Sequence, residues 1–233
     1  MDSNMMYQEV SKSSEEVTRN FIIKVYAWMT LALIITGVVG ISVVSSPVLL
    51  GLIFGNNITF FALIIAEVAL VIYLSRKALS MSAGMAKFWF VVYAALNGLT
   101  LSAIFFAYDL GTVGYTFLLT AALFAVMSLY GYFTKTDLTT IGNLFVMGLF
   151  GLVIATVFNM FYRSEGVSLA LTYLGVFIFI GLIGYDTQRI KGLSGAHNLT
   201  GTQNGNASIL GAMILYLDFI NLFIRLLRLM NRK

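Results

Sequence analysis

Seven apolar runs, each long enough to cross a lipid bilayer, set what this chain can fold into. They are about 17 to 24 residues long, and a helix of that length spans the ~30 Å hydrocarbon core at 1.5 Å per residue. The runs cover residues 21–44, 58–74, 86–108, 112–133, 140–161, 168–185 and 209–230. The sequence therefore predicts an all-α integral membrane protein, in which a tail at 1–20 precedes a single domain of seven transmembrane helices at 21–233.

The charge content agrees with a membrane location and excludes several classes of function. Only 10% of the residues are charged, whereas soluble domains carry about 25%. The net charge is +4, and several basic residues lie between the apolar runs, which indicates contact with lipid headgroups and no nucleic-acid partner. The chain has no cysteine and one histidine, too few ligands for a catalytic metal centre. We therefore expect no enzymatic activity, intramembrane hydrolysis included, and no cofactor.

The distribution of lysine and arginine predicts the orientation in the membrane. Residues 1–20 carry charges and no apolar core, unlike a cleaved signal peptide, so we expect the N-terminus in the cytoplasm. Arg163 is then the only basic residue expected in the loops on the opposite side. The basic residues expected on the cytoplasmic side are Lys12, Arg19, Lys24, Arg76, Lys77, Lys87, Lys135, Arg189 and Lys191. A seventh full span would place Arg232 and Lys233 outside, whereas a last segment that enters and returns would keep them inside. Both alternatives for the C-terminus stay open.

Turn-forming residues predict where the helices are connected. Two short links are indicated at 109–111 and 135–137. Longer loops are indicated after the first run, by Ser46, Pro47, Gly55, Asn56 and Asn57, and late in the chain, by Ser194, Gly195, Gly201, Gly205 and Asn206.

Small residues recur at four-residue steps in two of the runs. They are Ala32, Thr36 and Gly40 in the first run and Ala94, Gly98 and Ser102 in the third. Small side chains on one helix face let two backbones approach closely within a membrane. We expect both series to be packing surfaces between helices.

The last apolar run carries a narrow polar stripe. Asp218, Asn221, Arg225 and Arg228 follow one another at steps of three, four and three residues, which places them on one face of a helix. An ionised group at the bilayer centre costs roughly 2.5 to 3.5 kcal/mol, so this face should contact protein or water. The alternative is an amphipathic helix that lies on the membrane surface with its arginines among the headgroups.

Depth along the helices suggests ion pairs between the second and the last run. Arg76 follows Glu67 by nine residues, ~13.5 Å, and Arg228 follows Asp218 by ten residues, ~15 Å. If the two helices are antiparallel, Arg76 lies at the same membrane depth as Asp218, and Glu67 at the same depth as Arg228. Arg225 could replace Arg228 as the partner of Glu67. Nine residues place Glu67 and Arg76 on opposite helix faces, so only one of the two pairs is expected to form well.

A second aspartate could lie beside Asp218. Asp186 ends the sixth run, where an isolated carboxylate would normally reach the headgroup layer. If the last helix begins near the inner surface, Asp186 and Asp218 lie at a similar depth, beside Arg76. Two carboxylates at hydrogen-bonding distance cannot both ionise cheaply, so the pair would share a proton. Once separated and deprotonated, the same oxygens would attract a hard cation such as Ca²⁺.

Three segments carry a family resemblance: GYDTQRIK, with Asp186, LYLDFINLFIRLLR, with Asp218, and IIAEVALVIYL, with Glu67. With seven spans in 233 residues, they resemble the transmembrane Bax inhibitor motif family, which includes Bax inhibitor-1, in its bacterial branch. The resemblance implies a seven-helix bundle with the last helix at its centre, in the bacterial plasma (inner) membrane. It also implies a pH-dependent calcium leak, in which Asp186 and Asp218 are the pH-sensing pair and Arg76 is their basic partner.

Two functions follow from these expectations. The first is a pH-sensitive calcium leak channel, gated by the proton-sharing aspartates, which would also be the calcium ligands. The alternative is an interaction protein that regulates other membrane proteins, as a protease or cell-death and stress regulator, without conducting ions. The expected partners are membrane lipids, calcium ions and protons, with another membrane protein as the partner in the second case, and the expected state is a monomer.

Overall fold

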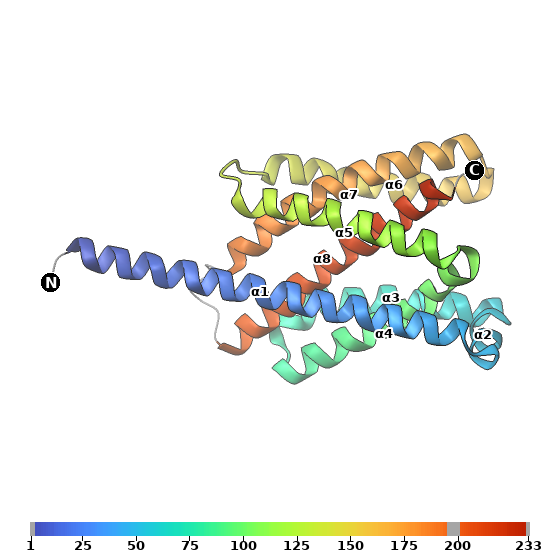
Figure 1. The fold of residues 1–233 in the computed structure, drawn as a ribbon, viewed down its shortest axis with the longest axis horizontal. Coiled ribbons are helices and arrows are strands. Elements are labelled where there is room, and N and C mark those ends of the chain that lie inside the picture. The colour runs from blue at the N-terminus through green and yellow to red at the C-terminus, as the bar shows by residue number, and fades with distance from the viewer. Residues whose placement is uncertain (1–2, 195–200, 232–233) are drawn as a thin grey trace. The chain divides into compact units, whose positions relative to one another are not determined.

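The computed structural model describes residues 3–194 and 201–231, which are almost entirely helical (Figure 1). No strand occurs among these residues. The helices, with the short 3-10 helix η1, are α1 (Ser3–Val44), α2 (Pro47–Phe54), α3 (Asn57–Lys77), η1 (Ala78–Ser80), α4 (Ala83–Ala107), α5 (Leu110–Phe133), α6 (Thr139–Tyr162), α7 (Glu165–Ser194) and α8 (Gly201–Met230).

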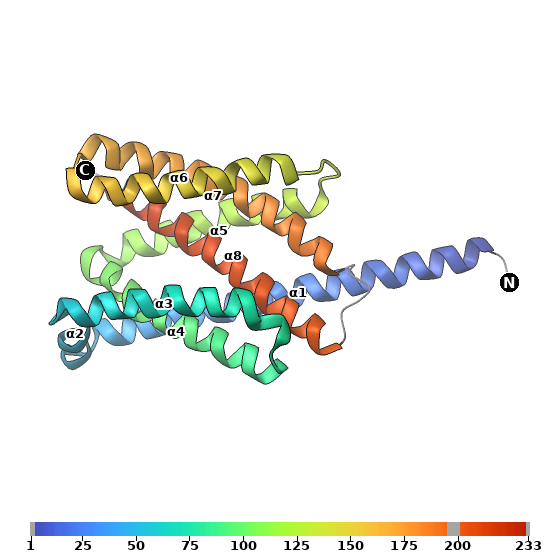
Figure 2. The same cartoon turned by 180° about the vertical axis from the view of Figure 1, so that it is seen from behind.

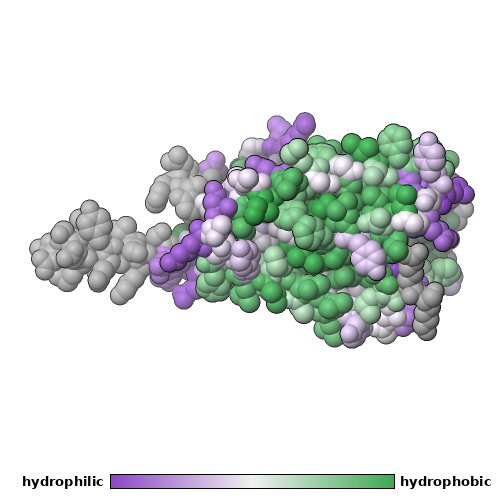
Figure 3. Space-filling model, turned by 90° about the horizontal axis from the view of Figure 1, so that it is seen from above, coloured by the Kyte–Doolittle hydropathy of each residue, from purple (hydrophilic) through white to green (hydrophobic). Residues whose placement is uncertain are grey.

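Seven helical stretches are long and apolar enough to cross a membrane, which confirms the predicted all-α fold with seven spans. They are Glu15–Val44, Asn57–Ser80, Ala83–Ala107, Leu110–Phe133, Thr139–Tyr162, Glu165–Ser194 and Gly205–Met230. Apolar side chains predominate on the described surface of the face drawn in Figure 3. An apolar outer surface is what lipid tails require, so the chain is an integral membrane protein.

The helices group into two compact units, and α8 contributes to both. The first unit consists of the described residues of Met1–Ala107 and Ile190–Met213, and the second of those of Tyr108–Arg189 and Ile214–Lys233. Of the 18 residues in the most apolar part of α8, 72% are buried. In the corresponding parts of the other six spans, between 6% and 33% of the residues are buried. Burial of this extent does not fit a helix that lies on the membrane surface with one face exposed, and the central position expected for α8 stays a prediction.

In the first unit, α1, α3 and α4 lie side by side (Figures 1 and 2). The Thr36 hydroxyl on α1 donates a 2.9 Å hydrogen bond to the Ala94 carbonyl on α4. A Cβ added to Gly98 would lie 2.8 Å from the Thr36 carbonyl oxygen, so only glycine permits this approach of the two backbones. The predicted packing surfaces formed by small residues are therefore confirmed.

In the second unit, α7 packs closely against α5 and α6. A Cβ on Gly131 of α5 would collide with the Gly184 carbonyl of α7, and one on Gly142 of α6 with the Tyr185 ring. The second half of α8 packs through Phe219, whose ring centroid lies 5.2 Å from that of Phe117 on α5. These contacts fix the position of α7 immediately before Asp186.

One predicted loop is wrong, because the segment after the first span forms the short helix α2. The Ser46 hydroxyl caps α2 by accepting a bond from the Leu49 N–H at 3.4 Å, and Pro47 is the first helical residue. Serine before a helix and proline at its first position are helix-start signals, because that N–H needs no intrahelical partner. The same two residues were interpreted as turn formers.

The helices also extend further than their apolar runs. α7 continues from Asp186 to Ser194, so Asp186 lies inside the helix and not at its end. α8 begins at Gly201 and includes Gly205 and Asn206, which were expected in a loop. Polar residues such as Gln, Arg and Lys have good helix propensity, so loss of hydropathy does not end a helix. Gly195 lies outside the described residues.

The extent of the terminal helices bears on two further expectations. α8 is a single uninterrupted helix of 30 residues, long enough for a full span and without the turn of a re-entrant segment. α1 begins at Ser3, so 3–20 continue the first membrane helix as its leading turns. The cytoplasmic position of the N-terminus and the single-domain assignment of 21–233 stay predictions.

Candidate functional site

The structure brings Asp186 of α7 and Asp218 of α8 together in the second unit. Their side chains lie within hydrogen-bonding reach of each other, and the two residues are only 8% and 6% exposed. Asp218 Oδ2 is buried and receives no hydrogen bond from an N–H or O–H donor of the described residues. Two ionised carboxylates cannot donate to each other, whereas one proton between them makes an O–H···O hydrogen bond. The geometry therefore favours a pair that shares a proton.

Arg189 is the basic residue closest to this pair in the second unit. Its Nη1 lies 4.0 Å from Asp186 Oδ1, one helical turn away, and its side chain is 60% exposed. An exposed ion pair at this distance contributes little to stability. Arg189 was expected only among the cytoplasmic basic residues, although the spacing of three residues in DTQR places the Asp186 and Arg189 side chains on one helix face.

The residues next to Asp186 attach α7 to its neighbours. The Thr187 and Ser128 hydroxyls lie 3.2 Å apart, which links α7 to α5. Gln188 Nε2 donates to the Thr136 carbonyl at 2.8 Å, and Gln188 Oε1 accepts from the Leu138 N–H at 2.9 Å. Thr187 and Gln188 thus position the helix turn that carries Asp186. Sequence analysis missed Thr187 and Gln188, because their partners lie about 50 residues away or more.

On α8, large side chains around Asp218 hold the helix in the second unit. Tyr216 is fully buried, and Phe219 is 2% exposed. The Phe219 ring lies between those of Phe117 and Phe124 of α5, at centroid distances of 5.2 and 5.7 Å. Rotation of α8 about its axis would expose these rings, so their packing determines the direction in which Asp218 points.

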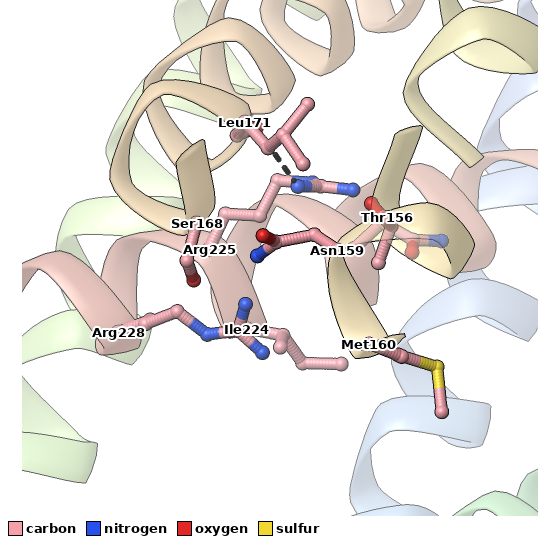
Figure 4. Close-up of a pocket in the computed structure, with 9 residues that line it drawn as sticks. Thr156, Asn159, Met160, Ser168, Leu171, Ile224, Arg225 and Arg228 are labelled. Carbon is pink, nitrogen blue, oxygen red and sulfur yellow. Dashed lines mark hydrogen bonds between the residues drawn. The ribbon is translucent and has the colours of Figure 1, made fainter. Parts of the chain in front are cut away.

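The two arginines of the α8 stripe lie further along the helix. Arg225 follows Asp218 by seven residues, ~10.5 Å. Its Nη1 donates to the Leu171 carbonyl of α7 at 3.3 Å, and its guanidinium lies 5.4 Å from the centroid of the Phe179 ring. Together with Arg228, it lines a cavity of the second unit (Figure 4).

Glu67 and Arg76 belong to the first unit. Glu67 Oε1 accepts a 2.6 Å hydrogen bond from the Thr100 hydroxyl of α4, a partner that sequence analysis did not consider. Arg76 is exposed in the last turn of α3. The pairings expected for these residues, Arg76 with Asp218 and Glu67 with Arg228 or Arg225, join the two units and stay predictions.

The carboxyl pair offers few ligands to a metal ion. Among the described residues, no group of three or more His, Cys, Asp or Glu side chains is arranged to hold a metal. Asp186 and Asp218 supply four carboxylate oxygens at most, whereas Ca²⁺ takes six to eight oxygen ligands. The pair alone therefore cannot complete the coordination of a calcium ion, and its role as a calcium ligand stays a prediction.

The chain is similar to bacterial proteins over most of its length. Inner membrane protein YbhL of Escherichia coli (strain K12) is 44% identical over 216 residues, which cover 92% of each chain. An uncharacterized protein of Deinococcus radiodurans is 40% identical over 215 residues, 92% of this chain and 91% of the relative. Protein RP147 of Rickettsia prowazekii is 37% identical over 229 residues, 96% of this chain and 94% of the relative.

A protein-family model gives the same assignment. The model described as "Inhibitor of apoptosis-promoting Bax1" matches residues 18–233, which include all seven spans and both aspartates. The resemblance seen in the sequence is thereby confirmed. Since the family model and relatives of 37–44% identity each cover more than nine-tenths of the chain, the chain belongs to the Bax inhibitor-1 family of membrane proteins.

Proposed function

We propose that the chain is a pH-sensitive calcium leak channel in which Asp186 and Asp218 form the gate. The observation that carries this proposal is the direct contact of two buried carboxyl groups on neighbouring helices of the second unit. Buried carboxyl groups are costly to retain, and in membrane spans they commonly mark proton or ion pathways.

The number of protons on the pair sets the force between α7 and α8 at this level. With one proton shared, an O–H···O⁻ hydrogen bond holds the two helices together. When that proton leaves, two negative charges face each other in a medium of low dielectric constant and repel strongly. The helices then separate at this level, and the freed oxygens can replace part of the hydration shell of a calcium ion.

Calcium flux through liposomes that contain only the purified chain tests this gate. The wild type is expected to conduct calcium at a rate that changes with pH. In Asp218→Asn, the amide is neutral at every pH and can still donate a hydrogen bond to Asp186, so the pH dependence of the flux is expected to disappear. Flux and pH response equal to those of the wild type would contradict the gate.

Asp137→Asn is a matched control for this substitution. Asp137 lies in the link between α5 and α6, and hydrogen bonds from the hydroxyl and N–H of Thr139 hold the pKa of its carboxyl below its ordinary value. Asp137 is therefore ionised between pH 5 and 8, and its substitution should leave the pH response unchanged. Absence of calcium flux from the wild type at any pH would instead favour an interaction protein that regulates other membrane proteins.

We further propose the bacterial inner membrane as the location, because the relative from Escherichia coli is named an inner membrane protein. The distribution of basic residues supports a cytoplasmic N-terminus, and seven full spans then place the C-terminus on the other side. A reporter fused after Lys233 tests this orientation. Reporter activity in the cytoplasm would contradict it, together with the pairing of the second and last spans.

A further inference from the structure

A polar cavity in the second unit plays no part in the proposed gate. Its volume is about 380 Å³, and it lies between the last turns of α6, the first turns of α7 and the second half of α8 (Figure 4). The nine described residues that line it include Arg225 and Arg228 and no acidic residue. Its wall thus carries two positive charges and no negative charge.

The second unit satisfies these two arginines poorly. Within the described part of the chain, Arg225 donates one hydrogen bond, to the Leu171 carbonyl at 3.3 Å, and its buried Nε has no partner. Arg228 makes no hydrogen bond or ion pair with the described residues of this unit, and its charge repels that of Arg225. Two neighbouring cations at the wall of a cavity are unfavourable without a counter-charge. An anion from outside the unit would supply it.

Other side chains of the wall have hydrogen-bond donors to spare. The Ser168 hydroxyl donates to no described group of the second unit, and the amides of Asn159 and Asn221 each use one N–H for a backbone carbonyl and keep the other. In Figure 4, the Asn159 amide and the Arg228 guanidinium point toward the same part of the cavity, beside Ser168. Guanidinium, amide and hydroxyl donors together match a phosphate group, whose ionised oxygens only accept hydrogen bonds.

An ordinary role at a helix end accounts for only one of these residues. Arg228 lies in the last turn of α8, where a cation offsets the helix dipole. Arg225 lies nearly one turn further inside the helix, and Asn159 and Ser168 are on α6 and α7. The helix dipole explains neither Arg225 nor the donors contributed by the other two helices.

The size and surroundings of the cavity favour a lipid phosphate over a free ion. A volume of about 380 Å³ falls in the range of ~300–1,000 Å³ that is typical of ligand pockets. Met160 of the wall is 66% exposed, and the next residues, Phe161 and Tyr162, are 81% and 80% exposed. Acyl chains can pack against these side chains while the headgroup enters the cavity. We propose that the cavity binds the phosphate group of an anionic phospholipid, with Arg225 and Arg228 as its charged ligands.

Glu165 is an internal competitor for this phosphate. It lies in the first turn of α7 and lines, together with Arg228, a smaller cavity of about 270 Å³. The two side chains form no ion pair within 4.0 Å. A carboxylate at this position still lowers the positive potential near Arg228. Replacing Glu165 with glutamine should therefore tighten phosphate binding.

Titration calorimetry on the purified full-length chain tests the site, with dioctanoyl phosphatidylglycerol, dioctanoyl phosphatidylcholine and inorganic phosphate as probes. Phosphatidylglycerol is expected to bind saturably, and more tightly than the zwitterionic lipid. Arg228→Gln should weaken this binding by about tenfold or more, because charge-assisted hydrogen bonds to phosphate are lost. Arg163→Gln is the matched control, since Arg163 follows α6 directly but does not line the cavity, and its effect should stay below about twofold.

Three outcomes would overturn the proposal. Equal losses in Arg228→Gln and Arg163→Gln would mean that only the general positive charge matters. Absence of saturable binding of any probe would exclude a phosphate site, and binding of inorganic phosphate as tight as that of phosphatidylglycerol would exclude a lipid as the source. If Arg228→Gln does not fold, Arg228→Lys keeps the charge but loses the planar fork of donors, and should bind less tightly than the wild type. None of these readouts depends on calcium flux.

Discussion

The two units differ in the partners of their buried polar and charged groups. In the first unit, Glu67 accepts from Thr100 at 2.6 Å and the Asn97 amide donates to the Tyr93 hydroxyl at 2.8 Å, both neutral partners, whereas the buried Oδ1 of Asn206 has no partner among the described residues. In the second unit, groups of like charge are neighbours. Asp218 lies beside Asp186, and Arg225 is near enough to Arg228 for their charges to repel. Groups of like charge in contact cost stability unless a shared proton or a counter-ion neutralises them, so we expect the pH response of the chain to depend on the second unit.

The largest expected effect on stability comes from replacing a glycine with alanine at a close contact between helix backbones, once in each unit. Gly131→Ala in the second unit would push α5 away from the Gly184 backbone and displace Asp186. We expect a loss of about 1–3 kcal/mol of stability from overpacking, together with an altered pH response of calcium flux. Gly98→Ala in the first unit should cost a similar amount and leave the pH response intact. Thermal unfolding in detergent and liposome flux measure the two effects.

Two other glycines serve as controls for this comparison. A Cβ on Gly37 of α1 or on Gly114 of α5 meets no atom within 4 Å. Alanine at either position should therefore be neutral or stabilise by up to about 1 kcal/mol through helix propensity. If Gly98→Ala changed the pH response as much as Gly131→Ala, the assignment of the pH response to the second unit would be wrong.

The next effect in size concerns the carboxyl pair and is measured by a double-mutant cycle. Asp186→Asn and Asp218→Asn each remove one of the two groups that share the proton, so the second substitution should add little to the first. We expect an interaction energy of about 0.5–3 kcal/mol, the range found for residues in contact. Unfolding of the wild type, both single variants and the double variant at one pH gives this value. Additive effects within about 0.3–0.5 kcal/mol would show that the two carboxyl groups act independently.

A smaller effect is expected at Gln188, which ties α7 to the link between α5 and α6. Gln188→Ala removes the bonds to the Thr136 carbonyl and the Leu138 N–H, each worth about 0.5–1.5 kcal/mol. Gln188→Glu keeps the acceptor for Leu138 and loses the donor to Thr136, so its stability should fall between those of the wild type and Gln188→Ala. A Gln188→Glu variant no more stable than Gln188→Ala would mean that the bond to Leu138 contributes nothing.

The local features of the fold could be predicted from the sequence, whereas the surroundings of the site could not. Apolar length and the four-residue spacing of small residues, around Thr36 in one run and around Gly98 in another, are properties of single segments, so the spans and the α1–α4 packing followed directly. The depth of Asp186 and Asp218 is also set by position along a helix. Gln188 escaped prediction because its partners come from a distant link, and the polar stripe with Arg225 did not reveal that α6 and α7 would close a cavity around it.

The smallest expected effect on stability comes from the residues that cap a helix in each unit, which are neutral in the first unit and charged in the second. In the first unit, the side chain of Asn56 caps α3 by accepting from the Ile58 N–H at 2.9 Å. In the second unit, Asp109 caps α5, and hydrogen bonds from the Thr112 hydroxyl and N–H hold the pKa of Asp109 below its ordinary value of 3.8. A lowered pKa means that the cap stabilises the fold above pH 3.8 and that this stabilisation is lost as the pH falls through the pKa of the folded state. Only the cap of the second unit should therefore respond to acid.

Asp109→Asn tests this difference, because asparagine caps about as well as aspartate and carries no charge. The variant should be slightly less stable than the wild type at pH 7, where the aspartate also gains from the positive end of the helix dipole. The difference between the two proteins should shrink as the pH falls through the lowered pKa of Asp109 in the folded state, since the wild-type carboxyl then takes up its proton. Thermal unfolding between pH 3 and 7 measures the convergence, and Asn56→Asp should introduce the same acid sensitivity into the first unit. A difference as large at pH 3 as at pH 7 would mean that shape, and not charge, distinguishes the two caps.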